Sequence, residues 1–461
     1  MSRPQTRIAL LMEHIRAQIA ARTLLPGARL PSVRQQAGLA GVSVSTVVEA
    51  YERLAAENLI VSRPGAGFFV SGPVAPLDLT RMAAGVDRAI DPLWISRQSL
   101  DADDRVLKPG CGWLPESWMY EEGMRRALRR AARASTPLLT DYGTPAGHPG
   151  LRHFLLRRMA LAGIHATPAQ IMLTESGTQA IDLICRFLLQ PGECVLVDDP
   201  CYFNFHALLR AHRVKVIGVP YTATGPDLAA FEEALHLHTP RLYITNAGIQ
   251  NPTGATLSPA TAHRLLKMAE ASDLVIVEDD IFADFEQQPA PRLAAFDGLS
   301  RVIQIGSFSK SISASVRCGY IAARPDWIDS LIDLKIATSF GGGGLAAEIV
   351  LATLTDSGYR RHMESVRGRL AVAMQATLGL LAQVGITPWH TPQAGMFLWC
   401  RLPAGAEATA VSRACLEQGI ILAPGNAFSQ SGTASDFLRF NVSRSTDPKL
   451  ITVLKGVLAA V

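Results

Sequence analysis

The sequence predicts an α/β protein with a small N-terminal module and a large domain, whose mostly parallel sheet carries helices on both faces. Two patterns predict this division. Residues 1–72 follow helical and then β-rich periodicity. In residues 106–461, apolar strand-like runs alternate with helical patterns. The 461 residues have room for about three structural units, and residues 73–105 are predicted to be a linker.

Charge is distributed unevenly along the chain. Residues 1–72 hold eight arginines, no lysine and four glutamates, and this excess accounts for the whole formal net charge of +4. A basic module on a neutral body indicates a polyanion as the partner of the module. The alternative is an ordinary solvated basic face.

The composition, with 48% hydrophobic and 18% charged residues, is typical of a soluble globular protein. No apolar run is long enough to cross a membrane, and the N-terminus lacks the apolar region of a signal peptide. The seven cysteines are scattered and form no C-x-x-C pair. We therefore expect a cytoplasmic protein without disulfides or a bound metal.

The first elements of the module are two helices. Apolar residues at helical spacing predict a helix over residues 8–22, which Pro26-Gly27 interrupts. Ser32 followed by Gln35 has the pattern of a capping box and predicts a short helix to residue 39.

A third helix is predicted over residues 43–57, after a tight turn at residues 40–42. Two β-rich runs on either side of residues 63–67 then predict a hairpin. The stripe of the third helix that we expect to be buried consists of Val44, Val47, Val48, Tyr51 and Leu54. The side chains that we expect to face outward are Ser43, Ser45, Thr46, Glu49 and Arg53.

This order of elements is typical of a winged helix-turn-helix, in which the second helix of the pair enters the DNA major groove by its N-terminal residues. Ser43, Ser45 and Thr46 would then face bases or phosphates. Arg34 and Arg63 would contact the backbone, because guanidinium groups bind phosphate well. The alternative is a small helical docking domain, which the apolar pattern alone does not exclude.

The module resembles the GntR family of bacterial repressors over nearly all of residues 7–71. One difference is Val44, because many members carry an arginine at this position. The motifs that carry the resemblance are Leu30-Pro-Ser-Val-Arg34, Val42-Ser-Val-Ser-Thr-Val47, Ala50-Tyr-Glu-Arg-Leu54 and Gly65-x-Gly67-x-Phe69-Val70.

The predicted linker begins at Pro73 and shows no sustained periodicity. We expect part of it to pack on the large domain through Leu93, Trp94 and Ile95. A linker of this length would let the module change its position relative to the large domain.

In the large domain, four apolar runs are strand candidates, and each ends in polar or glycine-rich residues. Ligands of such sheets bind outside the carboxyl ends of the strands. The four candidates are Cys194–Val197, Leu242–Thr245, Leu274–Val277 and Val302–Ile305.

Four polar clusters follow strands or begin a helix in this domain. Residues 175–179 could hold a phosphate at a helix start. Residues 246–254 include Asn251, which could donate to a ring hydroxyl, although the segment also fits a simple turn. The acidic residues 278–280 are costly to bury without a cation, and a protonated pyridine nitrogen would supply one. Residues 306–310 end in Lys310, whose amine becomes a nucleophile toward aldehydes when its neighbours lower its pKa.

Each cluster has an ordinary structural explanation by itself, such as a helix start, a turn or a solvated loop. Their shared order along the chain makes these explanations improbable together, and one cofactor fits all four. Arg317 follows Lys310 by seven residues and could join Ser307 and Ser309 in binding a phosphate dianion.

Residues 106–461 resemble a fold type I pyridoxal-phosphate enzyme of the aminotransferase class I/II kind, which has a smaller C-terminal α+β subdomain. The motifs that carry the resemblance are Tyr142-Gly-Thr-Pro-Ala-Gly147-x-x-x-Leu-Arg152, Asp199-Pro-x-Tyr202, Asn251-Pro-Thr-Gly254, Glu278-Asp279-Asp280, Ser307-x-Ser309-Lys310 and Arg317-x-Gly319-Tyr320.

The resemblance implies a role for each matching residue. Lys310 would form the internal aldimine with pyridoxal phosphate, Asp279 would pair with the pyridine nitrogen, and Tyr202 would stack on the ring. Asn251 would bond the ring hydroxyl. The residues implied to hold the phosphate are Ser176, Gly177, Thr178, Gln179, Ser307, Ser309 and Arg317.

Two further residues match positions that bind the substrate or the second subunit of the family's dimers. Arg439 aligns with the arginine that grips a substrate carboxylate, for which a bidentate fork is suited. Its alternative is a surface ion pair. Proteins of this family are dimers, and the resemblance implies that Tyr142 reaches into the cofactor site of the neighbouring subunit.

One difference from the family concerns the chemistry of the ring. The family usually has a tyrosine two or three residues after the pyridine-pairing aspartate, where this chain has Ile281 and Phe282. Neither side chain can form a hydrogen bond, so the ring would be less well tuned for transamination. The choice of Asp279 over Asp280 as the pyridine partner stays open by one residue.

The combination of the two parts resembles the MocR subfamily of bacterial transcription regulators. It implies a homodimer that binds double-stranded DNA with two half-sites and senses an amino compound, or pyridoxal phosphate itself, at Lys310. The alternative is an active aminotransferase with a vestigial DNA-binding domain. A third possibility is a regulator that retains slow half-transamination.

Overall fold

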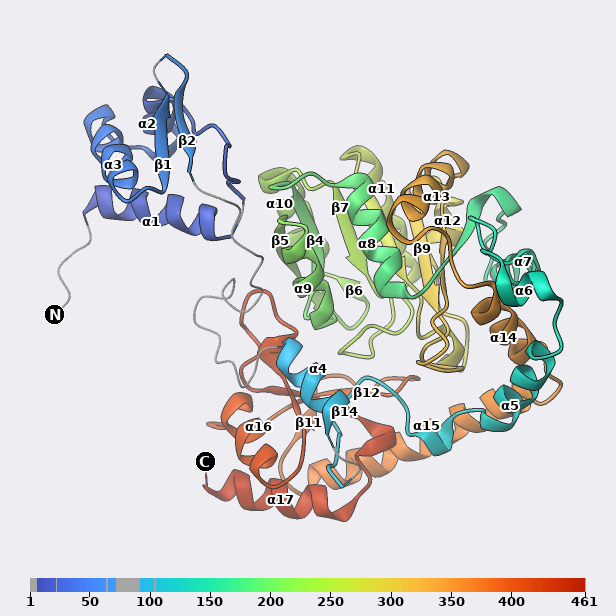
Figure 1. Cartoon of the computed structure of the whole chain (residues 1–461). Helices are drawn as coiled ribbons and strands as arrows, with labels where there is room; N and C mark the ends of the chain where they lie inside the picture. Colours follow the sequence, from blue (N-terminus) through green and yellow to red (C-terminus); the bar gives the residue numbers. More distant parts are fainter. Residues whose placement is uncertain (1–5, 22, 64, 72–91, 103–104, 461) are drawn as a thin grey trace. The chain divides into compact units, whose positions relative to one another are not determined.

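The fold is known from a computed structural model, which describes residues 6–21, 23–63, 65–71, 92–102 and 105–460. The described residues divide into two units, the N-terminal module and a large domain that begins at residue 92 (Figure 1).

The module is a three-helix unit followed by a hairpin, as predicted. The side chain of Ser32 caps the second helix by accepting from the N–H of Gln35 at 3.3 Å. Gly41 ends this helix in the left-handed region (φ 60°), where glycine carries no steric penalty. The two strands pair antiparallel from Ile60 opposite Val70 to Arg63 opposite Gly67. The elements are α1 (Arg7–Ala20), α2 (Val33–Ala40), α3 (Val44–Ala56), β1 (Ile60–Arg63) and β2 (Gly67–Val70).

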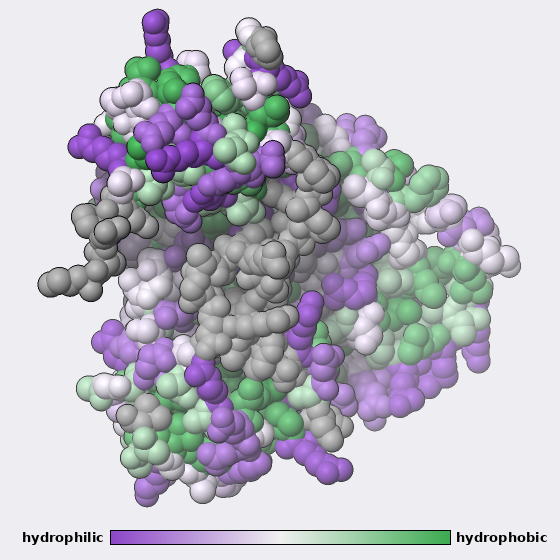
Figure 2. Space-filling model, turned by 60° about the vertical axis from the view of Figure 1, so that its left-hand side comes forward, coloured by the Kyte–Doolittle hydropathy of each residue, from purple (hydrophilic) through white to green (hydrophobic). Residues whose placement is uncertain are grey.

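The buried face of α3 differs from the predicted stripe at two positions. Val44 and Val48 are 49% and 38% exposed, so their assignment to the core was wrong. Ala50 is fully buried instead. The residues of α3 that face the core of the module recur at steps of three and one and occupy a narrow stripe, namely Val47, Ala50, Tyr51 and Leu54. On the face shown in Figure 2, hydrophilic side chains of the module are interspersed with hydrophobic patches.

The predicted linker contains a helix, α4 (Pro92–Asp101). Ser99 on α4 is buried, and the ammonium of Lys108 donates to the carbonyl of Ala102 just after the helix at 2.9 Å. The predicted contacts of Leu93, Trp94 and Ile95 lie outside the described side chains, and residues 73–91 lie outside the described residues.

The large domain is built on an eight-stranded sheet in the order β3-β10-β9-β8-β7-β4-β5-β6. The four predicted strands are confirmed as β4, β7, β8 and β9, and they are all parallel. Sequence patterns missed β3, β5 and β10, and β10 runs antiparallel to both of its neighbours. The strands are β3 (Ile171–Thr174), β4 (Cys194–Asp199), β5 (Lys215–Thr222), β6 (Gly225–Pro226), β7 (Leu242–Thr245), β8 (Val275–Asp279), β9 (Val302–Ser307) and β10 (Gly319–Ala322).

Helices cover both faces of this sheet (Figure 1). The connections from β3 to β4 and from β4 to β5 cross the sheet in one direction, and those from β5 through β7 and β8 to β9 cross it in the other. Because such crossovers are right-handed, the two sets of helices lie on opposite faces. The helices are α8 (Gly177–Leu188), α9 (Phe203–Ala211), α10 (Leu228–His238), α11 (Pro259–Ala271), α12 (Leu293–Asp297) and α13 (Pro325–Ser339).

A second, smaller sheet confirms the predicted C-terminal α+β subdomain. Its four strands pair antiparallel in the order β11-β12-β14-β13. The subdomain comprises α15 (Tyr359–Ala382), β11 (Thr387–Pro388), β12 (Phe397–Arg401), α16 (Ala408–Glu417), β13 (Ala423–Pro424), β14 (Phe437–Asn441) and α17 (Pro448–Ala460).

Four further helices complete the large domain: α5 (Glu121–Ala131), α6 (Thr136–Thr140), α7 (Pro149–Leu161) and α14 (Gly344–Leu354). Across the described ranges, every helix is too short or too polar to cross a membrane.

Candidate cofactor site

The four predicted polar clusters lie close together at the carboxyl ends of strands of the main sheet. Each follows a strand of that sheet, namely β3, β7, β8 and β9, and these strands point the same way. Together they form one wall of a cavity of about 300 Å³. Predicted residues that line this cavity are Ser176, Gly177, Thr178, Tyr202, Asn251, Asp279, Ser307, Ser309, Lys310, Arg317 and Arg439.

Lys310 lies in the loop after β9 and is partly buried. Burial lowers the pKa of its ammonium to about 8, with a further lowering by the charge of Arg439, while Asp279 opposes the shift. A Cβ atom placed on Gly112 would lie 3.9 Å from the Lys310 amine and 3.9 Å from Arg439. Gly112 therefore lies beside both side chains, and a larger fraction of the Lys310 amine is neutral at pH 7 than in an ordinary lysine.

The geometry separates Asp279 from Asp280. Asp279 faces the cavity, and burial raises the pKa of its carboxyl to about 7. Asp280 points away and pairs with the buried guanidinium of Arg292 at 2.9 Å. Glu286 binds the same guanidinium at 2.8 Å. The alternation of side chains at the end of β8 thus places one carboxylate in the cavity and the other in a buried ion pair.

The hydroxyls and the helix start predicted to hold a phosphate lie together. Ser176 caps α8 by accepting from the N–H of Gln179 at 3.0 Å, and the Ser307 and Ser309 hydroxyls are 3.0 Å apart. Gln179 does not line the cavity, because its side-chain carbonyl accepts from the N–H of Glu175 at 2.7 Å. Its backbone N–H donates to the Ser176 side chain, so both groups of Gln179 are engaged at the helix start, and its contact with the phosphate stays a prediction.

Arg439 is 1% exposed on β14 and pairs with no carboxylate among the described residues, which removes the alternative of a surface ion pair. Its guanidinium donates to the side-chain carbonyl of Asn251 at 3.0 Å and to the backbone carbonyl of Gly110 at 2.6 Å. Burial lowers the pKa of Arg439 to about 10. Since Asn251 accepts through its oxygen, its amide nitrogen is free to donate toward the cavity, as predicted for a ring hydroxyl.

Phe282 and Ile281 both line the cavity. Of the residues that line it, Tyr202 carries the one phenol, and burial raises the pKa of Tyr202. No side-chain donor therefore replaces the family's tyrosine at these two positions.

Several residues of the cavity were missed by sequence reasoning. Gly112 and Trp113 come from a loop whose only signal is a glycine pair around Cys111. Ser96 and Leu100 come from α4, inside the predicted linker.

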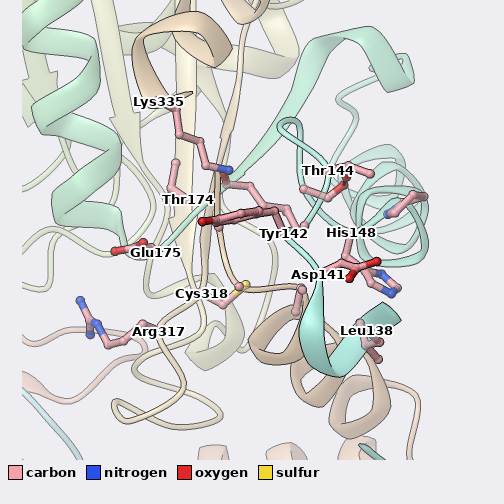
Figure 3. A pocket seen from close by; sticks show the side chains of 18 of the residues that line it. Leu138, Asp141, Tyr142, Thr144, His148, Thr174, Glu175, Arg317, Cys318 and Lys335 are labelled. Carbon is pink, nitrogen blue, oxygen red and sulfur yellow. Dashed lines mark hydrogen bonds between the residues drawn. The ribbon is translucent and has the colours of Figure 1, made fainter. Parts of the chain in front are cut away.

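Tyr142 is 80% exposed and does not line this cavity. It lies in a neighbouring pocket of about 200 Å³ together with Arg317 and Lys335 (Figure 3). Arg317 lines both spaces. The ammonium of Lys335, which is 1% exposed, donates to the carbonyls of Pro145 and Leu173 and so holds the Tyr142 loop against the end of β3.

The residues of the cavity fit pyridoxal phosphate. The Lys310 amine, with its lowered pKa, is suited to the cofactor aldehyde. The buried carboxyl of Asp279, with its raised pKa, lacks the cation that a pyridinium would supply. The start of α8, two serine hydroxyls and Arg317 are suited to the phosphate. When bound, the cofactor supplies a covalent anchor for amino groups and an electron sink. The fold and the site define a pyridoxal-phosphate protein of the aminotransferase type that carries a winged helix-turn-helix.

Comparison with known proteins gives the same two parts. The model of the family "Aminotransferase class I and II" matches residues 119–457, and that of the "Bacterial regulatory proteins, gntR family" matches residues 9–70. The chain belongs to the aminotransferase class I and II family and has a GntR-type domain at its N-terminus. Pyridoxal phosphate is accordingly the cofactor of the large domain.

Relatives that align with most of the chain are regulators by name. The chain is 30% identical to the uncharacterized HTH-type transcriptional regulator YdcR of Escherichia coli K12, over 94% of each chain. It is 26% identical to the HTH-type transcriptional regulator NorG of Staphylococcus aureus USA300, over 80% of this chain and 86% of NorG. This organisation is the one predicted for the MocR subfamily, and the chain is a GntR-type regulator fused to an aminotransferase-like domain.

Among solved structures, the chain resembles the α-aminoadipate aminotransferase LysN of Thermus thermophilus, complexed with N-(5'-phosphopyridoxyl)-L-leucine. The two share 28% identity and a TM-score of 0.72, over 80% of this chain and 96% of LysN. The kynurenine aminotransferase of Pyrococcus horikoshii has the same fold, with a TM-score of 0.73 at 23% identity, over 83% of this chain and 97% of that one.

Proposed function

We propose that the protein is a homodimeric transcription regulator in which the cavity at Lys310 senses an amino compound, or pyridoxal phosphate itself, and thereby changes DNA binding. The observation that carries this proposal is the position of α4. Its residues Ser96 and Leu100 line the cavity, and α4 is the first described helix after the segment that joins the DNA-binding module. A ligand in the cavity therefore meets a helix that continues directly into the connection to the module.

The cavity is suited to a ligand with an amino group and a carboxylate. Lys310 and Arg439 line it together, and a Cβ on Gly112 would be equally close to both side chains. The Nε atom of Arg439 is buried without a hydrogen-bond partner in the described structure. A ligand carboxylate would satisfy this donor, because buried guanidinium N–H groups favour a charged acceptor. Ligand binding can shift the arrangement of the DNA-binding modules only if its affinity differs between arrangements.

The proposed dimer face surrounds Tyr142. Its ring contacts that of Phe340, with the centroids 4.9 Å apart, and both side chains are mostly exposed. Other large apolar side chains that are exposed on α5, α6 and α14 are Leu128, Leu139 and Leu345. A second subunit would bury this apolar surface and bring Tyr142 to the partner's site.

In the module, the arginines assigned to DNA differ from Arg16 and Arg53 in their partners. Arg34 and Arg63 are exposed and form no ion pair among the described residues. Arg16 pairs with Glu13 and Glu57, and Arg53 pairs with Glu49. Guanidinium groups without an ion pair are suited to DNA phosphates, although that of Arg63 also lies over the Phe69 ring at 4.5 Å. We propose that the protein acts on the chromosome in the cytoplasm.

A working aminotransferase is the second candidate, and the completeness of the cofactor site favours it. The absence of a side-chain donor at Ile281 and Phe282 favours the regulator instead. The two candidates are separated by mixing the protein, loaded with pyridoxal phosphate, with amino acids and an oxo-acid acceptor, and by measuring affinity for duplex DNA with and without the cofactor.

For a regulator we expect slow or single-turnover spectral changes and specific DNA binding that depends on the cofactor or amino compound. Rapid multiple turnover without any specific DNA binding would refute the proposal in favour of the enzyme.

Arg34→Ala is expected to weaken binding to all DNA sequences and to lower the slope of log K against log salt by about one unit, because one phosphate contact is lost. Arg16→Ala is the matched control: it removes the same charge from a guanidinium already paired with Glu57 at 2.5 Å, and should leave the slope nearly unchanged. Filter binding or fluorescence anisotropy between 50 and 200 mM salt measures both. A change in sequence preference at constant slope would contradict the phosphate assignment of Arg34.

A further inference from the structure

We propose that α3 recognises thymine methyl groups through Val44 and Val48, so that the DNA site carries thymine where the first two turns of α3 meet the major groove. This inference rests on the proposed DNA binding and adds which base is read and by which residues.

The two valines form an exposed apolar pair at the start of the recognition helix. Val44 is the first residue of α3, and Val48 is one turn further along the same side. They are 49% and 38% exposed. Neither belongs to the described core of the module or to the partly buried residues packed against it. The fold of the module therefore does not account for apolar side chains at these positions.

The polar side chains beside them are already engaged with one another. The Ser43 hydroxyl accepts from the N–H of Thr46 at 3.1 Å and lies 2.9 Å from the hydroxyl of Ser45 and 2.7 Å from that of Thr46. Farther along, Glu49 pairs with Arg53 at 2.5 Å. Of the three hydroxyls that the sequence assigned to bases or phosphates, that of Ser43 caps α3 and the other two contact it. The exposed apolar groups beside them are the methyl groups of the two valines.

Thymine is the base that matches such a surface. In the major groove the other base edges present hydrogen-bond donors and acceptors, whereas thymine adds its C5-methyl group, which is read by apolar contact. Charge favours DNA over an apolar protein partner, because the unpaired Arg34 and Arg63 belong to the same basic module.

The test uses the full-length protein loaded with pyridoxal phosphate and duplexes selected from a random-sequence pool. In the selected site, each thymine is replaced in turn by deoxyuridine, which lacks only the methyl group. We expect at least one thymine in each half-site whose replacement raises Kd about fourfold, the effect of losing one buried methyl. In Val44→Ala or Val48→Ala the ratio of Kd for the deoxyuridine duplex to Kd for the thymine duplex should fall to about one, because the thymine methyl loses its partner.

Val61→Ala is the matched control, since Val61 is 42% exposed on β1 and lies outside α3. It should retain the full deoxyuridine penalty, and all three variants should keep the wild-type melting temperature. A penalty that persists in both α3 variants, or no penalty at any thymine, would overturn the inference while leaving DNA binding intact. Failure to select any sequence would instead overturn the proposed function and the inference with it. A loss of dimers in Val44→Ala would show that the valines form a protein interface.

Discussion

Lys310→Ala is expected to abolish the visible absorption band that the wild-type protein gains with pyridoxal phosphate, and to leave the fold intact. The band requires a covalent bond from the cofactor aldehyde to an amine. Within the described cavity Lys310 is the one lysine. Because burial lowers the pKa of its ammonium to about 8, the charged form is less stable in the folded protein at neutral pH than in the unfolded chain. Its removal should therefore not lower the melting temperature.

Lys310→Arg is the matched control for charge, because it keeps a cation at the site but has no amine that can react. We expect both variants to lack the band. In the wild-type protein, borohydride reduction followed by peptide mapping should place the cofactor on the peptide that contains Lys310. A band of normal intensity in either variant, or a label on another lysine, would refute the assignment.

The same lysine predicts how cofactor loading depends on pH. Only the neutral amine attacks an aldehyde, so the loading rate of the apoprotein should rise about tenfold per pH unit below the pKa and level off near pH 8. An ordinary lysine would still be gaining reactivity above pH 9. Stopped-flow absorbance between pH 6 and 10 measures this, and a rate that continues to rise tenfold per unit up to pH 10 would contradict the lowered pKa.

The parts of the fold that follow from local periodicity could be predicted from sequence. The strands β4, β7, β8 and β9 are continuous apolar runs that end in polar clusters, which is what burial on both faces requires. In contrast, β10 is short and antiparallel, and its Gly319 begins the strand directly after the Arg317 motif. The pairing of β10 with β3 joins segments that are distant in sequence, and periodicity does not reveal such contacts.

Sequence motifs predicted the position of site residues that directly follow a strand. They were less successful for residues whose position depends on contacts with other parts of the fold. Lys310, Asp279 and Asn251 lie where their motifs placed them. Gln179 does not line the cavity, because a local hydrogen bond to Glu175 holds its side chain. Gly112 was missed because a loop of this kind has no distinctive pattern.

A similar limit applies to α3, where helical spacing alone could not separate the core from an exposed apolar surface. Val44 and Val48 fit the predicted stripe in period. Only the packing of the module shows that Ala50 occupies the core and that the two valines do not. Ala50 is fully buried but only weakly apolar, so the prediction left it out of the buried stripe and included the two more apolar valines.

Adjacent carboxylates at the end of β8 should respond to neutralisation in opposite ways. In the apoprotein, burial raises the pKa of Asp279 to about 7. The folded state thus binds more protons than the unfolded state between about pH 4 and 7, and this contribution to stability is lost as the pH rises through 7. At pH 8 Asp279→Asn removes an unfavourable buried charge, and we expect the apoprotein to gain on the order of 4 kcal/mol in free energy of unfolding.

Asp280→Asn should instead destabilise the apoprotein. Its carboxylate pairs with Arg292 at 2.9 Å, and the two side chains are 9% and 3% exposed. Loss of one partner of a buried ion pair leaves the other charge uncompensated. Glu286 remains bound to the same guanidinium, so we expect a loss of about 3 kcal/mol, near the lower limit for such pairs. Urea unfolding of both apoproteins at pH 8 measures this difference.

The cofactor should narrow the difference in stability between the two variants. A pyridinium nitrogen would supply the cation that Asp279 lacks, so the wild-type protein should gain more stability from pyridoxal phosphate than Asp279→Asn does, and the variant should bind it more weakly. Asp280→Asn should keep the wild-type gain, because Asp280 faces Arg292 and not the cavity. If Asp280→Asn lost cofactor affinity while Asp279→Asn kept it, the two roles would have to be exchanged. If both apoproteins were destabilised equally at pH 8, the raised pKa of Asp279 would be wrong.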